Sequence, residues 1–124
     1  MLKKIMLIDD DESTNLYHEI LLEESNKVEQ IVICNGVDEA MEHLSNSDIP
    51  PEFIFLDINM PVKTGWDFIE EYENLEDSKK AKYLMILSTT RNPIEIERAI
   101  NNKHVFQFYT KPLTLNMIEQ MIDE

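Results

Sequence analysis

Four large apolar residues, Phe-Ile-Phe-Leu, follow one another at positions 53 to 56 without a polar break. A continuous run of this length is typical of a β-strand that is buried on both faces, as in a parallel sheet. The run ends on a carboxylate, Asp57, before a turn that contains Pro61 and Gly65. Open α/β sheets bind ligands at the carboxyl ends of their strands, but an Asp there often caps the next helix instead. This stretch alone leaves both interpretations open.

Similar apolar runs recur along the chain and predict further strands at 5–8, 28–34, 83–87 and 105–109. Apolar residues at helical spacing follow each run. They predict helices within 13–24, 37–44, 66–75, 93–100 and 115–122. In the first helix, Leu16, Tyr17, Ile20 and Leu21 form the apolar stripe that we expect to face the core. Alternation of strands and helices with short connections predicts an α/β fold, a parallel sheet covered by helices on both faces.

Length and charge narrow the class of protein. The 124 residues suit one domain, and no linker or repeat divides them, so we expect a single domain over 1–124 with no output domain. The net charge of −14 argues against nucleic acid and anionic membranes as partners. A lone cysteine, Cys34, lies in an apolar run and is expected to be a buried structural thiol. Without a disulfide, a signal peptide or an apolar stretch of membrane-spanning length, the expected location is the cytoplasm.

Polar side chains stop the predicted strands at their carboxyl ends: Asp9 and Asp10, Asp57, Ser88 and Lys111. Strand ends of a parallel sheet share one edge, so these five residues are expected to converge. Three close carboxylates repel each other, by about 1 to 4 kcal/mol per pair at 4 Å, and need a positive partner. Lys111 is one candidate and a divalent cation is the other, with Mg²⁺ favoured by an open, all-oxygen ligand set. Together these groups suit phosphoryl transfer, with the central carboxylate as acceptor.

Four fragments in this order carry a family resemblance: Ile8-Asp9-Asp10, residues 56–61 with Gly65, Leu87-Ser88-Thr89, and residues 108–112 (Phe-Tyr-Thr-Lys-Pro). With them the chain resembles bacterial two-component response-regulator receiver domains of the stand-alone chemotaxis type. The resemblance covers essentially the whole chain. It implies a flavodoxin-like, doubly wound sheet of five parallel strands in the order 2-1-3-4-5.

The resemblance also implies a role for each site residue. Asp57 would be the phosphoacceptor, Asp10 a direct Mg²⁺ ligand and Asp9 a ligand through water. The backbone carbonyl of Asn59 would complete the protein ligands of the metal. Lys111 would pair with Asp57 or its phosphoryl group. The peptide bond between Lys111 and Pro112 would be cis, as in the family.

Switching is the second implied property. Ser88 would bond a phosphoryl oxygen, and Phe108 would be the aromatic ring that follows the position of Ser88. Ser88 stands where the family usually has Thr, and Phe108 lacks the hydroxyl of the more common Tyr. Thr89 is bulkier than the usual small residue, so we expect slow access of the phosphodonor and slow hydrolysis. The expected output surface is residues 93–124.

The implied function is signalling rather than turnover of a separate substrate, so the chain would catalyse only its own phosphorylation and slow dephosphorylation. A sensor histidine kinase or a histidine phosphotransfer protein would supply the phosphoryl group, and a downstream protein would receive the signal from a monomer or weak dimer. The alternative is a Mg²⁺-dependent phosphohydrolase with an aspartyl nucleophile, which needs a second acid where this chain has Asn59. A calcium loop at 57–59 is disfavoured by Pro61, and a flavodoxin-like cofactor carrier by the lack of a glycine-rich phosphate loop.

Simpler interpretations exist for several of these residues. The acidic run 9–12 is also what a helix N-terminus requires, and Lys111 alone reads as a surface lysine. Phe108 alone fits an ordinary core position. The three histidines, His18, His43 and His104, lack ligand spacing and are expected at the surface or the edge of the core.

Overall fold

The computed structural model describes residues 2–122, which form one five-stranded parallel sheet in the order β2-β1-β3-β4-β5. The fold predicted from the sequence and the resemblance is confirmed. The strands are β1 (Leu2–Ile8), β2 (Val28–Cys34), β3 (Phe53–Leu56), β4 (Tyr83–Ser88) and β5 (Gln107–Thr110). None of the helices among the described residues is both long and apolar enough to cross a membrane.

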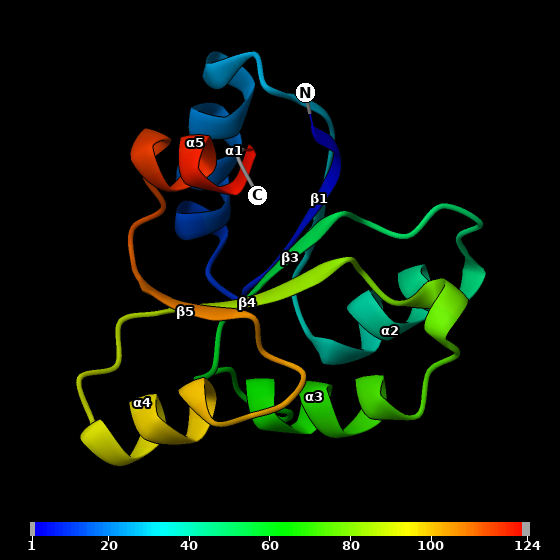
Figure 1. Cartoon of the computed structure of the whole chain (residues 1–124), viewed down its shortest axis with the longest axis vertical. Helices are drawn as coiled ribbons and strands as arrows, with labels where there is room; N and C mark the ends of the chain where they lie inside the picture. Colours follow the sequence, from blue (N-terminus) through cyan, green and yellow to red (C-terminus); the bar gives the residue numbers. More distant parts are fainter. Residues whose placement is uncertain (1, 123–124) are drawn as a thin grey trace.

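Five α-helices connect and cover the strands, as Figure 1 shows. They are α1 (Glu12–Ser25), α2 (Val37–Asn46), α3 (Gly65–Glu73), α4 (Pro93–Ile100) and α5 (Leu115–Ile122), with a short 3-10 helix η1 at Asp77–Lys79. Helices α1 and α5 lie on one side of the sheet, and α2, α3 and α4 lie on the other.

The alternating side chains of the strands divide the core into two layers. Met6, Ile54 and Ile86 pack toward α2 and α3, in one cluster with Phe68 and Leu44. Their sequence neighbours on the strands point to the opposite face and join a second cluster with α1 and α5: Ile5, Leu7, Phe53, Phe55, Met85 and Leu87. Both faces of the central strands are therefore buried, which is why β3 reads as an unbroken apolar run.

The strand register places the predicted site residues at one level. Ile8 pairs with Leu56, and Leu56 pairs with Ile86 on the next strand. The residues that follow Ile8 and Leu56 therefore leave neighbouring strands side by side at the same edge. On the far side of β4, Ser88 pairs with Thr110, so Lys111 leaves β5 next to the end of β4.

The predicted orientation of the first helix is wrong for most of its apolar stripe, and of those four residues only Leu21 packs against the core, partly buried. The residues of α1 that face the core are Asn15, His18 and Leu22, whereas Leu16, Tyr17 and Ile20 are 56%, 54% and 45% exposed. Both stripes have helical spacing, so periodicity alone does not distinguish them. The inward face carries two polar side chains with partners in the fold, because Asn15 bonds the Asp9 carbonyl after β1 and His18 bonds the Leu113 N–H after β5.

Smaller differences concern the element ends and the exposure of α4. β1 begins at Leu2, before the predicted start, and β5 begins at Gln107, after it. A turn in which the Asn102 carbonyl accepts the N–H of Val105 delays β5. The helical spacing that predicts α4 includes Ile94, Ala99 and Ile100; Ala99 is buried, but Ile94 and Ile100 are 77% and 63% exposed.

Candidate functional site

The acidic run after β1 divides into two functions. Asp11 caps α1, because its carboxylate accepts the backbone N–H groups of Ser13 and Thr14. The hydrogen bonds from these N–H groups lower the pKa of Asp11. Asp9 is 5% exposed and lies back toward the sheet, where its Oδ1 accepts the N–H of Asp11. Helix capping thus explains Asp11 and leaves Asp9 and Asp10 for another role.

Asp57 does not cap the helix that follows it. Thr64 caps α3 through a capping box with Asp67, and Asp57 stays at the end of β3, 8% exposed, with its N–H bonded to the Ile8 carbonyl at 2.9 Å. Gly65 closes the turn, because a Cβ at this position would lie 2.6 Å from the Asp57 carbonyl oxygen. The turn therefore requires glycine there and brings the chain close to the backbone of Asp57 and Ile58.

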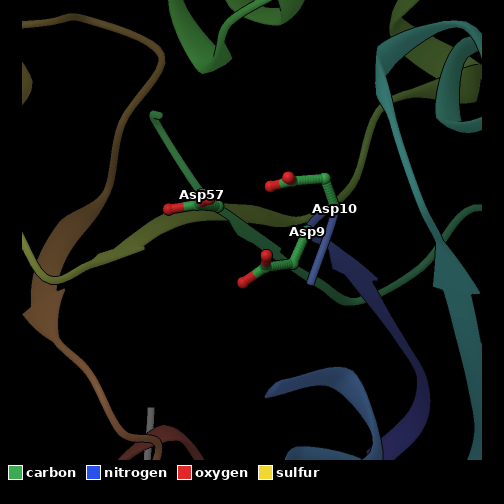
Figure 2. Close-up of side chains that lie close together, drawn as sticks. All are labelled: Asp9, Asp10 and Asp57. Atoms are coloured by element: carbon green, nitrogen blue, oxygen red, sulfur yellow. The ribbon is translucent and has the colours of Figure 1, made fainter. Parts of the chain in front are cut away.

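The side chains of Asp9, Asp10 and Asp57 come together at the ends of β1 and β3 (Figure 2). One carboxylate oxygen from each lies within 4.8 Å of the other two. Burial, followed by the negative charge of Asp9, raises the pKa of Asp57 to about 6, although Lys111 opposes the shift. The site therefore holds a carboxylate whose charged form lacks full compensation.

Lys111 supplies the nearest positive charge. Its Nζ lies 2.5 Å from Asp9 Oδ2 and 3.3 Å from Asp57 Oδ1. Burial would lower the pKa of Lys111, but the hydrogen bond to Asp9 and the charge of Asp57 more than offset it, so the pKa is raised. The simpler interpretation of Lys111 as a surface lysine is wrong, since its side chain is only 13% exposed.

Ser88 and Thr89 differ in accessibility. Ser88 is fully buried, its Oγ accepts the N–H of Thr90 at 3.1 Å, and its carbonyl accepts the N–H of Lys111 at 2.9 Å. Thr89 is exposed. It lines a cavity of about 340 Å³ with Lys111 and with residues of α1 that include Tyr17.

The remaining predicted residues lie in the loop after β3, on β5 and directly after β5. Asn59 is exposed in the loop after β3, where the carbonyls of its neighbours Ile58 and Pro61 accept hydrogen bonds from Gly65 and Lys63. Phe108 is half-buried on β5, with its ring against the cluster shared with α2 and α3. The expected cis peptide is present at Lys111-Pro112.

Two polar residues near the site were missed or misplaced by sequence reasoning. Asn15 and His18 are 3% and 2% exposed, so the expectation that His18 lies at the surface or core edge is wrong. They share a helix face with Leu22, and this spacing was visible in the sequence. The competing apolar stripe concealed it. Cys34, in contrast, is buried as expected, and burial raises the pKa of its thiol to about 12.

The donor set fits a small divalent cation. Asp9, Asp10 and Asp57 offer only oxygen atoms, and the exposure of Asp10 leaves room for water ligands. Mg²⁺ prefers oxygen ligands and keeps several waters, often beside one or two carboxylates and a phosphate group. Excess negative charge beside a single lysine would also favour a cation here.

Comparisons with known proteins agree with this geometry. A family model described as the response regulator receiver domain matches residues 5–123. The crystal structure of a two-component response regulator from Cytophaga hutchinsonii is similar, with a TM-score of 0.87, 25% identity, and coverage of 98% of this chain and 95% of that chain. A receiver protein from Dyadobacter fermentans has a TM-score of 0.86, 27% identity and the same coverage of 98% and 95%.

A curated relative is longer than this chain. The sensory transduction protein LytT of Enterococcus faecalis is 26% identical over 121 residues, which are 97% of this chain and 46% of that protein. The chain therefore spans about half the length of this relative.

Proposed function

Because the chain belongs to the response regulator receiver domain family, we propose that Asp57 accepts a phosphoryl group from a phosphohistidine of a sensor kinase or a phosphotransfer protein. The observation that carries this proposal is the placement of Asp57. It is a nearly buried carboxylate within reach of one lysine and two further carboxylates at the open edge of the sheet. A group that served only as a helix cap or a surface charge would not need these partners.

In the proposed reaction, a carboxylate oxygen of Asp57 attacks the phosphorus atom of the donor. The bond from phosphorus to the donor nitrogen breaks as the new oxygen–phosphorus bond forms, and the product is an acyl phosphate on Asp57. The ammonium of Lys111, already 3.3 Å from Asp57 Oδ1, would accompany the negative charge of the transferring group. The hydroxyl of Ser88, which now accepts the N–H of Thr90, would give up this hydrogen bond and donate one to a phosphoryl oxygen.

Receiver domains bind Mg²⁺ at an acidic pocket, and we propose that Asp9, Asp10, Asp57 and the Asn59 carbonyl hold it here. When bound, the ion would neutralise charge on the carboxylates and on the phosphoryl oxygens. Asp9 and Asp10 then position the site, while Asp57 reacts.

The signal would pass from the site to α4, β5 and α5. Ser88 joins the site to β4, and its carbonyl is already bonded to the Lys111 N–H at the end of β5. A shift of Ser88 toward the phosphoryl group would change the packing of Phe108, which is half-buried on the paired strand. Exposed apolar residues of this surface, Ile94, Ile100, Phe106 and Leu115, would then meet a downstream protein.

The test is intact mass after incubation with acetyl phosphate, with and without Mg²⁺, beside an Asp57→Asn variant. We expect a gain of one phosphoryl group that requires Mg²⁺ and Asp57. A protein that stays unlabelled is then tested as Thr89→Ala. If this variant is labelled, the site is competent but obstructed; if it also stays unlabelled, the phosphoacceptor proposal is wrong.

A further inference from the structure

Two buried polar side chains lie on α1 in positions that the proposed reaction leaves unexplained. Asn15 and His18 are one helical turn apart and face the sheet, with exposures of 3% and 2%. Burial of a polar group is costly unless it is hydrogen-bonded, so the partners of such groups indicate their role.

Each of these side chains bonds to a different part of the site. Asn15 Nδ2 donates to the backbone carbonyl of Asp9 at 2.9 Å. His18 Nε2 accepts the backbone N–H of Leu113 at 3.2 Å, two residues beyond Lys111. One face of α1 is therefore bonded to the segment that carries Asp9 and to the segment that carries Lys111.

The sheet does not join these two segments directly. β1 and β5 are separated by β3 and β4, yet Lys111 and Asp9 form an ion pair of 2.5 Å across that gap. The contacts of α1 link the end of β1 to the segment after β5, on the face of the sheet that α1 and α5 cover. The space between Asp9, Asn15, His18 and Asp57 with their apolar neighbours is only about 10 Å³, so these side chains are closely packed.

The chemical state of His18 suits this contact. Burial, followed by the charge of Lys111, lowers the pKa of His18. A neutral imidazole with its proton on Nδ1 leaves a lone pair on Nε2, which is what accepting the Leu113 N–H requires. A leucine of similar size would leave that N–H without a partner.

We propose that Asn15 and His18 are positioning residues, which hold Asp9 and Lys111 in the geometry that phosphoryl transfer to Asp57 requires. This inference rests on the proposed phosphoacceptor function. Neither residue touches the phosphoryl group, because both act through backbone atoms of the segments that carry Asp9 and Lys111. Displacement of a reacting group by 1 Å can cost about a hundredfold in rate, so small shifts of Lys111 would be measurable.

The test compares rate constants of phosphorylation by phosphoramidate, a small donor, for the unsubstituted protein, His18→Leu and His18→Gln. Leu22→Val is the matched control, because Leu22 is buried on the same helix face but is one turn further from the site. We expect His18→Leu to be slowed by about ten- to a hundredfold. His18→Gln, whose amide oxygen also accepts a hydrogen bond, should recover most of the rate, and Leu22→Val should be labelled normally.

A double-mutant cycle separates positioning from general destabilisation. If His18 acts through Lys111, His18→Leu should have little further effect on a Lys111→Ala background. Asn15→Ala tests the contact with the Asp9 carbonyl, and it also serves as the test if His18→Leu does not fold. It should slow labelling, while its thermal unfolding temperature remains comparable to that of Leu22→Val.

Several results would overturn this inference while leaving the phosphoacceptor proposal intact. In one, the unsubstituted protein and His18→Leu are labelled at the same rate; in another, Leu22→Val loses as much rate as His18→Leu. The same holds if the full effect of His18→Leu persists without Lys111. An unsubstituted protein that is not labelled, even as Thr89→Ala, would instead overturn the phosphoacceptor proposal and this inference with it.

Discussion

Lys111 is bonded more closely to Asp9 than to Asp57: its Nζ lies 2.5 Å from Asp9 Oδ2 and 3.3 Å from Asp57 Oδ1. The lysine thus neutralises part of the charge at the proposed metal site while it remains within reach of the acceptor. In this arrangement, Lys111 and a bound cation would compete for the same carboxylates.

Replacement of Lys111 by alanine should strengthen Mg²⁺ binding and slow phosphorylation. The ammonium repels a nearby cation, and charges at about 4 Å interact by about 1 to 4 kcal/mol at effective dielectric constants of water and protein surfaces. We expect Mg²⁺ affinity, measured by calorimetry, to rise at least several-fold. Lys79→Ala, whose ammonium bonds the Ser47 carbonyl far from the carboxylates, is the control. Unchanged or weaker Mg²⁺ binding by Lys111→Ala would contradict this prediction.

Asp57→Asn should stabilise the folded protein at neutral pH. The pKa of Asp57 is raised to about 6, above the value of about 3.9 for an unfolded chain. The folded protein therefore binds more protons between these values, and its stability falls as the pH rises through this window. Removal of the charge should add about 1 to 3 kcal/mol to the free energy of unfolding at pH 7 without Mg²⁺, and nothing below about pH 4.

Urea denaturation at pH 4 and pH 7 measures this difference. Asp48→Asn, at an exposed position, is the matched control and should have little effect at either pH. A gain for Asp57→Asn that is equal at both pH values would show that charge is not its cause. Addition of Mg²⁺ should reduce the stability difference between Asp57→Asn and the unsubstituted protein. The unsubstituted protein keeps all three carboxylates, so it binds the ion more tightly and gains more stability from it.

Gly65→Ala should destabilise the protein and disturb the acceptor loop. The added Cβ would lie 2.6 Å from the Asp57 carbonyl oxygen and 2.8 Å from Ile58 Cα, which are both backbone atoms. We expect a loss of about 1 to 3 kcal/mol in thermal or urea unfolding, as for overpacking elsewhere. Gly36→Ala is the control, because a Cβ there would meet nothing within 4 Å. Similar losses in both variants would indicate a general effect of alanine rather than the close approach.

Thr89→Ala should increase both the rate of phosphorylation by acetyl phosphate and the rate of hydrolysis. Thr89 is exposed and lines a cavity with Lys111, and we expect its side chain to obstruct the approach of the donor from this side. Thr89→Val retains the volume and removes the hydroxyl. It should behave like the unsubstituted protein if bulk is the cause and like Thr89→Ala if the hydroxyl is. Equal rates in all three proteins, measured by intact mass over time, would contradict the prediction.

Much of the site was predictable because of parallel topology. Asp9, Asp57 and Lys111 each follow an apolar run, and a parallel sheet brings the ends of such runs to one edge whatever the details of packing. Because Ile8 pairs with Leu56, Asp9 and Asp57 follow paired residues and their carboxylates lie side by side. The roles of these residues in phosphoryl transfer remain predictions.

The first helix shows where this reasoning stops. Its sequence contains two stripes at helical spacing, one with Leu16 and Ile20 and one with Asn15, His18 and Leu22. Hydrophobicity favours the first, but the structure buries the second. Asn15 bonds the Asp9 carbonyl, which lies six residues earlier, but His18 gains its partner only when the Leu113 N–H is brought to it from 95 positions away.

The sequence by itself therefore determined the strand and helix alternation, the parallel sheet and the edge at which the carboxylates gather, because these follow from local periodicity and from where apolar runs end. The tertiary structure alone decided which face of α1 is buried and that Lys111 lies closer to Asp9 than to Asp57. Each depends in part on a contact between residues far apart in the chain, 95 positions for His18 with Leu113 and 102 positions for Lys111 with Asp9, and local patterns carry no information about such pairs.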